Sequence, residues 1–244
     1  MHVALIAHTP DPELVVAAAA RLSTAPVSAL ELKEKMGHEQ ALRLLTHLIA
    51  SGHLSPFEHV SFTFAIDGIS RAASHQLVRH RLASYTQQSQ RYVALKTLDY
   101  VTPDSIASRS ELEAKYREMV DACHALYRQM LEADIPAEDA RYILPNAAQT
   151  RLVMTMNARE LMHAASLRLC LRAQWEIVHL FENLKIEVSL VAPFIAAQLK
   201  PKCFHMGYCD ERECCGLMPT LADSTNSPQA GSAKSLKEKT ESAS

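Results

Sequence analysis

The sequence predicts a single α+β domain in which long helices pack on a small, mostly antiparallel sheet. Two segments, HVALIAH at 2–8 and VSFTFAI at 60–66, have the character of strands, and several later segments have helical periodicity. The chain has only six glycines and no repeated alternation of strand and helix. These observations argue against a doubly wound dinucleotide-binding fold and favour α+β.

The first elements are marked by local signals. Asp11 and Pro12 form a typical N-cap and first-turn pair, so a helix is expected directly after the first strand, and a second helix is expected over 38–52. In the strand at 60–66, large apolar residues alternate with small or polar ones. This alternation places His59 and Ser61 on a side that is free to meet a ligand.

The remaining elements are predicted from periodicity and composition. A helical pattern runs from Ile69 to about Arg81, and the polar segment 82–92 has no clear period and is expected to be a loop. Further helices are expected over 109–133, 158–170 and 173–199, with a strand over 151–157. Residues 220–244 are rich in Ser, Thr, Lys and Glu, which predicts a disordered tail after a domain over 1–219.

The composition limits the classes of protein that the chain can belong to. With 48% hydrophobic residues, 21% charged residues and a net charge of −2, the sequence is typical of a soluble globular protein rather than a nucleic-acid binder. No apolar run approaches the roughly 20 residues that span a bilayer, and the first residues lack the features of a signal peptide. We therefore expect a cytoplasmic protein with neither a membrane nor a nucleic acid as partner.

The segment RHRLASYTQQSQRY at 79–92 carries the strongest chemical signal. If the helix reaches Arg81, then Gln76, Arg79 and His80 share one face, and the following loop can return Ser89 and Arg91 toward it. Guanidinium groups and hydroxyls in this arrangement suit phosphate. The alternative interpretation is that the cations end a helix where its macrodipole favours them, before an ordinary solvated loop.

The same segment resembles the signature of the flavin-dependent thymidylate synthases. The matching residues are Arg79, His80, Arg81, Ser84, Ser89, Arg91 and Tyr92. Three further segments also resemble this family, in the family's order: SPFEHVSFTF at 55–64, ARYILP at 140–145 and NARELMHAASLRLCLRAQWEI at 157–177. The resemblance spans residues 1–219 and implies a domain of the thymidylate synthase complementing type.

The resemblance implies a homotetramer whose active sites are shared between subunits, with dUMP stacked on the flavin of FAD. The residues that would contact FAD are Ser61, Arg79, His80, Arg81, Gln87, Asn157, Arg159 and His163, with His59 orienting the flavin or guarding the folate entrance. The residues that would hold dUMP are Gln76, Arg79, Gln87, Gln88, Ser89, Gln90, Arg91, Arg141 and Arg168. Arg79 would serve both ligands, from different subunits.

Helix geometry bears on part of this assignment. Asn157 and Arg168 are eleven residues apart, so at about 100° per residue they fall almost on one face of a helix, and His163 lies well off it. Two positions depart from the family's pattern. Gln87 stands where many relatives carry Glu, and His163 stands where Asn is common.

The reaction implied is the methylation of dUMP to dTMP, with 5,10-methylenetetrahydrofolate as carbon donor and NADPH-reduced FAD as hydride source. Tetrahydrofolate would be released. The signature segment at 79–92 contains no cysteine, so uracil activation must come from elsewhere. The resemblance implies Arg168 as the catalytic residue, because its charge would stabilise negative charge that develops on the uracil ring.

The six cysteines are poor evidence for a disulfide scaffold in a chain of this size without a secretion signal. Cys203, His205, Cys209, Cys214 and Cys215 offer soft ligands for zinc, but their spacing is not that of a usual zinc knuckle. We expect local packing here and no metal. Two other functions stay open on the sequence: a module that grips RNA or another phosphate-bearing partner, and a metal-dependent nucleotide hydrolase.

Overall fold

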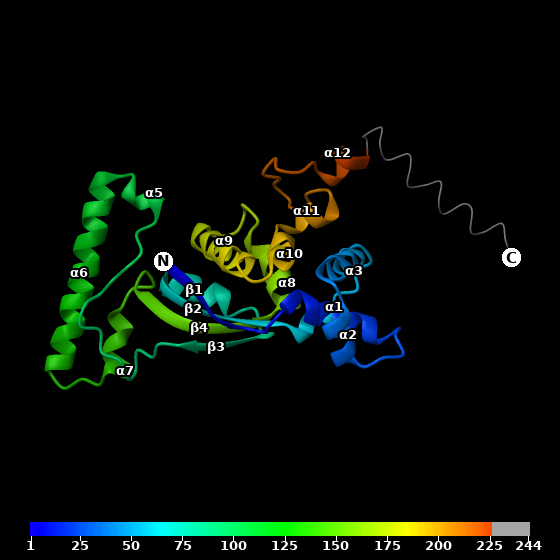
Figure 1. The fold of residues 1–244 in the computed structure, drawn as a ribbon. Coiled ribbons are helices and arrows are strands. Elements are labelled where there is room, and N and C mark those ends of the chain that lie inside the picture. The colour runs from blue at the N-terminus through cyan, green and yellow to red at the C-terminus, as the bar shows by residue number, and fades with distance from the viewer. Residues whose placement is uncertain (226–244) are drawn as a thin grey trace.

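A four-stranded antiparallel sheet lies at the centre of the molecule, in the computed structural model, which describes residues 1–225 (Figure 1). The strand order is β1-β2-β4-β3, and every pairing between neighbours is antiparallel. The strands are β1 (His2–His8), β2 (Ser61–Ser70), β3 (Ala83–Gln87) and β4 (Gln149–Asn157). The predicted α+β class with a small antiparallel sheet is confirmed.

Helices make up most of the remaining structure. They are α1 (Pro12–Leu22), α2 (Ala29–Lys35), α3 (His38–Ala50), α4 (Arg71–Leu77), α5 (Asp104–Ala107), α6 (Ser110–Glu132), α7 (Ala137–Ala140), α8 (Ala158–Arg168), α9 (Trp175–Ser189), α10 (Pro193–Gln198), α11 (Lys202–Met206) and α12 (Leu221–Thr225). Two short 3-10 helices are η1 (Ser55–His59) and η2 (Arg141–Ile143). None of the helices within residues 1–225 combines the length and the apolar character needed to cross a membrane.

The core lies between one face of the sheet and the helices that cover it. Phe62, Phe64 and Ile66 of β2 are fully buried, as are Met154 and Met156 of β4, because the two-residue period of each strand sends them to the same side. α9 crosses this side of the sheet in Figure 1 and contributes further buried side chains to the same cluster. Each large apolar side chain buried in this way contributes about 1.5–3 kcal/mol.

The opposite face of the sheet is polar and partly exposed. Ser61, Thr63, Arg151 and Thr155 lie on it, and the hydroxyls of Thr63 and Thr155 form a hydrogen bond of 3.0 Å across the two central strands. Ser61 is therefore on the open side, as the alternation of its strand predicts.

β2 contains a bulge at Gly68. Asp67 pairs with Arg151 but Ile69 pairs with Thr150, so Gly68 is an extra residue in the ladder, and its φ of 76° is in the region that favours glycine. A Cβ added at Gly68 would lie 3.3 Å from Gln149 Oε1. The site therefore favours glycine for both conformation and space.

α6 stands apart from the sheet as an arm at one end of the molecule (Figure 1). It is tied to the segment that follows β3, because the Tyr116 hydroxyl donates to the carbonyl of Val101 at 2.9 Å and the buried Tyr127 hydroxyl accepts from the backbone N–H of Leu95 at 3.2 Å.

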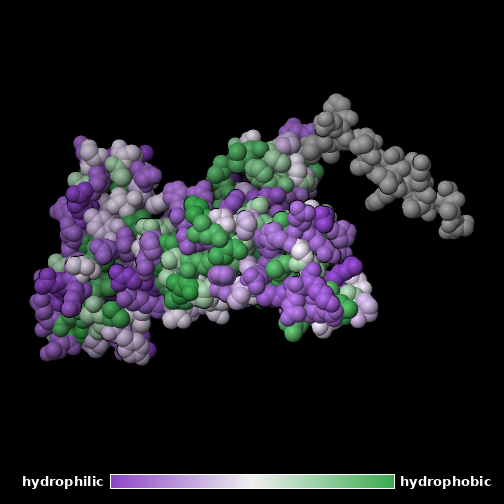
Figure 2. Space-filling model, in the orientation of Figure 1, coloured by the Kyte–Doolittle hydropathy of each residue, from purple (hydrophilic) through white to green (hydrophobic). Residues whose placement is uncertain are grey.

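The arm is largely hydrophilic in Figure 2, whereas a hydrophobic patch lies in the middle of the view, over α9. The exposed apolar residues of this region include Ile186 and Leu190.

Several sequence predictions need correction. The segment 82–92 is not all loop, since Ala83–Gln87 forms the edge strand β3. The helix predicted over 173–199 is two helices, because Pro193 begins α10 after a break at Leu190–Ala192. Asp11 stands at the N-cap of α1 but makes no side-chain capping bond, and its carboxylate instead pairs with Lys33 at 3.1 Å.

The predicted polar tail falls mostly outside the described residues. Its first part includes the short helix α12, so order continues at least five residues past Thr220. The prediction of disorder for 226–244 concerns residues that the structure does not describe.

Candidate functional site

A groove of about 920 Å³ lies beside α8. Its walls come from the end of α3, the turn after α4, the first turns of α8, and α11. The lining residues are Ile49, Leu54, Glu58, Arg79, His80, Arg81, Leu82, Asn157, Arg159, Glu160, Met162, His163, Ser166, Lys202, His205 and Met206. Six of the predicted FAD residues are among them: Arg79, His80, Arg81, Asn157, Arg159 and His163.

The start of α8 positions one wall of the groove. Asn157 ends β4 and caps the helix, because its Oδ1 accepts the backbone N–H of Glu160 at 2.8 Å. The first turn then brings Arg159 to the groove, where its guanidinium pairs with Glu58 of η1. His163 follows on the next turn and is exposed to the same space.

The turn after α4 positions the second wall. Ser70 caps α4 by accepting the backbone N–H of Ala73 at 3.0 Å, and the buried carboxylate of Glu176 holds the Ser70 hydroxyl at 2.6 Å. The helix predicted to run to about Arg81 ends at Leu77, so the condition under which Gln76, Arg79 and His80 would share a helix face is not met. Arg79, His80 and Arg81 nevertheless all line the groove, carried by a turn in which the N–H of His80 donates to the carbonyl of Leu77 at 3.2 Å.

His80 is the buried centre of the groove wall. Its Nε2 lies 2.9 Å from Nε of Arg168, and its Nδ1 lies 3.5 Å from Oε1 of Glu160. Burial, with the positive charge of Arg168 and the neighbouring His163, lowers the pKa of His80 to about 4. His80 is therefore neutral at physiological pH.

Two neighbours of His80 also have shifted pKa values. Burial raises the pKa of Glu160, with a smaller opposing effect from His163. Burial also raises the pKa of Tyr85, whose hydroxyl donates to the carbonyls of Leu77 and His80 at 2.9 and 3.1 Å. Tyr85 thus stays protonated and ties β3 to the turn that carries His80.

The groove suits a ligand that is anionic at one end and flat or apolar at another. Arg79, Arg81 and Lys202 supply positive charge, while Leu54, Leu82 and Met162 supply apolar surface. The Nζ of Lys202 is held by Asp210 and Glu211 at 2.9 Å each, so this cation is already partly neutralised. Arg79 and Arg81 are exposed and are the better candidates for phosphate.

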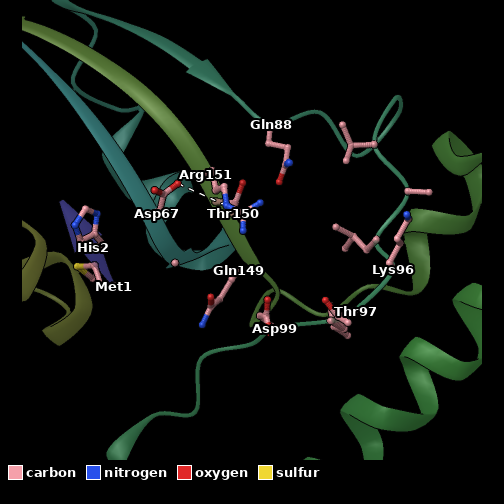
Figure 3. A pocket seen from close by; sticks show the side chains of 15 residues that line it. Met1, His2, Asp67, Gln88, Lys96, Thr97, Asp99, Gln149, Thr150 and Arg151 are labelled. Atoms are coloured by element: carbon pink, nitrogen blue, oxygen red, sulfur yellow. Dashed lines mark ion pairs between the residues drawn. The ribbon is translucent and has the colours of Figure 1, made fainter. Parts of the chain in front are cut away.

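A second cavity, of about 550 Å³, lies between the bulged end of β2 and the segment after β3 (Figure 3). Gln88 points into it from one side, and Asp67 and Arg151 pair across its floor at 3.6 Å. Lys96 and Asp99 come from the segment that α6 holds. The lining of this cavity and that of the groove have no residue in common.

Two of the residues predicted for dUMP, Arg91 and Arg141, contact Glu138 of α7. Its carboxylate accepts from Nε of Arg91 at 2.7 Å, and its backbone carbonyl accepts from Nε of Arg141 at 3.1 Å. Burial, with a smaller effect from the positive charge of Arg141, lowers the pKa of Arg71 at the start of α4. Arg71 is not among the residues predicted from the sequence.

The predicted site residues therefore fall into separate places in one chain. Arg168 joins the FAD set through His80, and its Nη2 donates to the carbonyl of Gln76 at 3.4 Å. Gln87 is used within the sheet, where its Nε2 donates to Thr150 at 3.1 Å. Four more predicted residues lie outside the groove lining, namely His59, Ser61, Ser89 and Gln90.

The cysteines at the carboxyl end of the described chain pack around one small void. Cys170, Cys203, Cys209 and Cys215 line it, and all are free thiols. Burial and the neighbouring thiols raise the pKa of Cys203. Within residues 1–225, no group of three or more His, Cys, Asp or Glu side chains is arranged to hold a metal ion.

Comparison with known proteins places this geometry in a family. Residues 4–194 match the family model described as thymidylate synthase complementing protein. Among the relatives, the flavin-dependent thymidylate synthase of Geobacter sulfurreducens is 48% identical over 213 residues, which cover 86% of this chain and 91% of that protein. The flavin-dependent thymidylate synthase of Clostridium tetani is 42% identical over 225 residues, covering 86% and 90%.

A solved structure agrees with these sequence matches. The UMP/dUMP methylase PolB from Streptomyces cacaoi, bound with 5-Br dUMP, superposes with a TM-score of 0.71 at 26% identity, covering 81% of this chain and 93% of that one. The groove built by α4 and α8, the matched residues and the shared fold lead to one conclusion: the chain belongs to the flavin-dependent thymidylate synthase family.

Proposed function

We propose that this protein methylates dUMP to dTMP, with 5,10-methylenetetrahydrofolate as carbon donor and NADPH-reduced FAD as hydride source. The methylene carbon becomes the new methyl group, the hydride of NADPH supplies its two electrons, and tetrahydrofolate is released. The observation that carries the proposal is the groove at α8, where six residues of the family's FAD set meet Arg168 through His80. Relatives at 40–48% identity are named for this activity.

The residues of the groove fit FAD by their chemistry. Arg79 and Arg81 would bind its phosphates, Asn157 and Arg159 would bind polar groups along the extended molecule, and Met162 would pack against an apolar part. His163 provides a hydrogen-bonding group that is exposed to the groove. When bound, FAD supplies hydride transfer, which side chains alone do not carry out.

Arg168 would act on the uracil ring of dUMP. Its guanidinium is held at Nε by His80, which leaves donors on its Nη atoms to face a ligand. A fixed positive charge at this point would stabilise negative charge as it develops on the ring during activation. No cysteine of residues 1–225 lines the groove, so a thiolate nucleophile is not at hand there.

The phosphate of dUMP would be bound by the arginines around Glu138. Arg91 and Arg141 both contact Glu138 in the free chain, and Ser89 accepts the backbone N–H of Arg91 at 3.2 Å, which shapes the loop around them. A phosphate could replace the Glu138 carboxylate as partner of Arg91, because a surface ion pair of this kind is worth only about 0–1 kcal/mol.

We propose a homotetramer in which neighbouring subunits complete each active site. Two observations support it: the groove and the cavity at Gln88 have separate linings in one chain, and apolar side chains such as Ile186 and Leu190 are exposed over α9. Exposed apolar patches of this kind are typical of surfaces that meet another chain. Assembly of copies would bring the residues of one chain to the ligand of another.

The first experiment is an absorbance spectrum of the purified protein, followed by anaerobic addition of NADPH with and without dUMP. We expect a flavin spectrum that bleaches faster when dUMP is present, and dTMP when methylenetetrahydrofolate is added. Absence of flavin binding even after FAD is supplied would contradict the proposal and favour a phosphate-binding module without catalysis. Nucleotide hydrolysis that requires a metal ion and no flavin would favour the hydrolase.

A further inference from the structure

Glu160 is a buried carboxylate that the fold alone does not explain. It is the third residue of α8, and only 6% of its surface is exposed. A glutamate at this position often folds back onto the helix end as part of a capping box. Here Asn157 already caps the helix, and the Glu160 carboxylate faces the imidazole of His80 instead.

The contact with Arg168 determines which nitrogen of His80 carries the proton. Arginine has donors and no acceptor, so the 2.9 Å contact between Arg168 Nε and His80 Nε2 requires a lone pair on Nε2. The proton of the neutral imidazole must then be on Nδ1, which is the atom that faces the Glu160 carboxylate. Glu160 therefore selects the tautomer that lets His80 accept from Arg168.

The surroundings hold this imidazole in place. The Tyr85 hydroxyl binds the backbone carbonyl of His80 at 3.1 Å, and the ring of Phe181 lies 6.2 Å from the imidazole, centroid to centroid. Packing thus fixes where the ring lies, while Glu160 fixes which nitrogen carries the proton. The two controls are separable by mutation.

Arg168 has its orientation set at two atoms. Nε is held by His80, and Nη2 reaches the carbonyl of Gln76. A guanidinium held at one edge presents its remaining donors in a fixed plane. If the imidazole carried its proton on Nε2, two N–H groups would face each other, and the guanidinium would have to turn away.

We propose that Glu160 is a positioning residue which, through His80, holds the guanidinium of Arg168 in the plane that meets the pyrimidine of the substrate. This inference rests on the proposed function, since it assigns Arg168 to the pyrimidine. In this proposal Glu160 acts through His80 and not by contact with the substrate. Its contribution is to the affinity for dUMP and to the rate of the step that Arg168 assists.

The test measures dUMP binding to the oxidised, FAD-loaded enzyme by calorimetry, in the absence of turnover, and dTMP formation separately. For Glu160→Leu we expect full FAD content, a dUMP dissociation constant raised about 10-fold and a kcat lowered about 100-fold, the range seen when a partner that orients a ligand-binding group is lost. Glu160→Gln should stay within about 3-fold of wild type in both, because its amide oxygen can still face the Nδ1 proton as an acceptor.

Two controls separate positioning from general structure. Glu13→Leu removes another buried carboxylate, which accepts the backbone N–H of Phe194 at 2.7 Å away from the groove, and should leave dUMP affinity unchanged. In a His80→Gln background, Glu160→Leu should cause no further loss, because residues that act through one another are not additive. If Glu160→Leu does not fold, Glu160→Asp, which withdraws the carboxylate from Nδ1, should raise the dissociation constant about 3-fold.

The outcomes distinguish the two levels of the hypothesis. Wild-type enzyme that binds no dUMP would defeat the proposed function. Wild-type binding that Glu160→Leu or Glu160→Asp leaves unchanged, or losses that add fully to those of His80→Gln, would overturn the positioning role alone.

Discussion

Arg168 and Arg91 are predicted to hold the same nucleotide, yet the chain supports them differently. Arg168 is bound at Nε by the buried His80, which is in turn faced by the buried Glu160. Arg91 pairs with Glu138 where both side chains are about half exposed, at 51% and 47%. A pair in solvent is screened and weak, whereas a buried contact fixes geometry. The orientation of Arg168 is therefore fixed before a ligand binds, whereas Arg91 can exchange Glu138 for a ligand.

The largest effect is expected from Arg168→Ala, which removes the arginine that His80 holds in place. We expect this variant to retain FAD and lose at least about 1,000-fold in kcat, because it removes the charge that we propose acts on the uracil ring. Flavin content and single-turnover dTMP formation would be measured on the same sample. Near-normal dTMP formation would remove Arg168 from the mechanism.

Because the imidazole of His80 is buried, the stability of the folded protein should depend on pH. The pKa of His80 lies at about 4 in the folded protein and near its usual 6.5 in the unfolded chain, so only the unfolded chain gains this proton between those values. The free energy of unfolding should therefore fall as pH is lowered from about 6.5 to about 4, by at most about 1.4 kcal/mol per pH unit from this group.

Urea unfolding of wild type and of His80→Gln across this range would isolate the effect, since the other titrating groups are common to both. The groups around His80 are Glu160, Arg168 and His163. Parallel pH profiles for the two proteins would mean that His80 is not held neutral.

The smallest effect is expected at Arg91, which is about half exposed. Arg91→Ala is expected to weaken dUMP binding about 10-fold, the loss of one charge-assisted contact to phosphate, with little change in stability.

A mixture of inactive Arg168→Ala and impaired Arg91→Ala subunits, unfolded and reassembled together, should recover activity if the two arginines reach one site from different subunits. If the reassembled mixture did not exceed the activity of either parent, both arginines would be placed in the same subunit.

Much of the fold could be predicted because its signals are local. The alternation of Phe62, Phe64 and Ile66 gave β2 and its buried face, and the segment at 79–81 indicated the cations that meet at the groove. Each of these is encoded by residues within a few positions of one another. Local periodicity and residue type are sufficient there.

What could not be predicted depends on contacts far apart in the sequence. β3 looks like a loop because Ser84 and Thr86 face the open side of the sheet, and only pairing with β4 makes the segment a strand. His80 and Arg168 are 88 residues apart, and nothing local to either predicts the contact. The role of Glu160 is invisible for the same reason.

The bulge at Gly68 sets the phase of everything that follows it. Because strand residues alternate between faces, one extra residue exchanges the faces for the remainder of the strand. Ile69 thereby reaches the core, and Ser70 reaches Glu176 and caps α4, the helix that delivers His80 to the groove. Deleting a single residue from this strand would therefore rotate α4 and displace His80, although no ligand-binding side chain would have been changed.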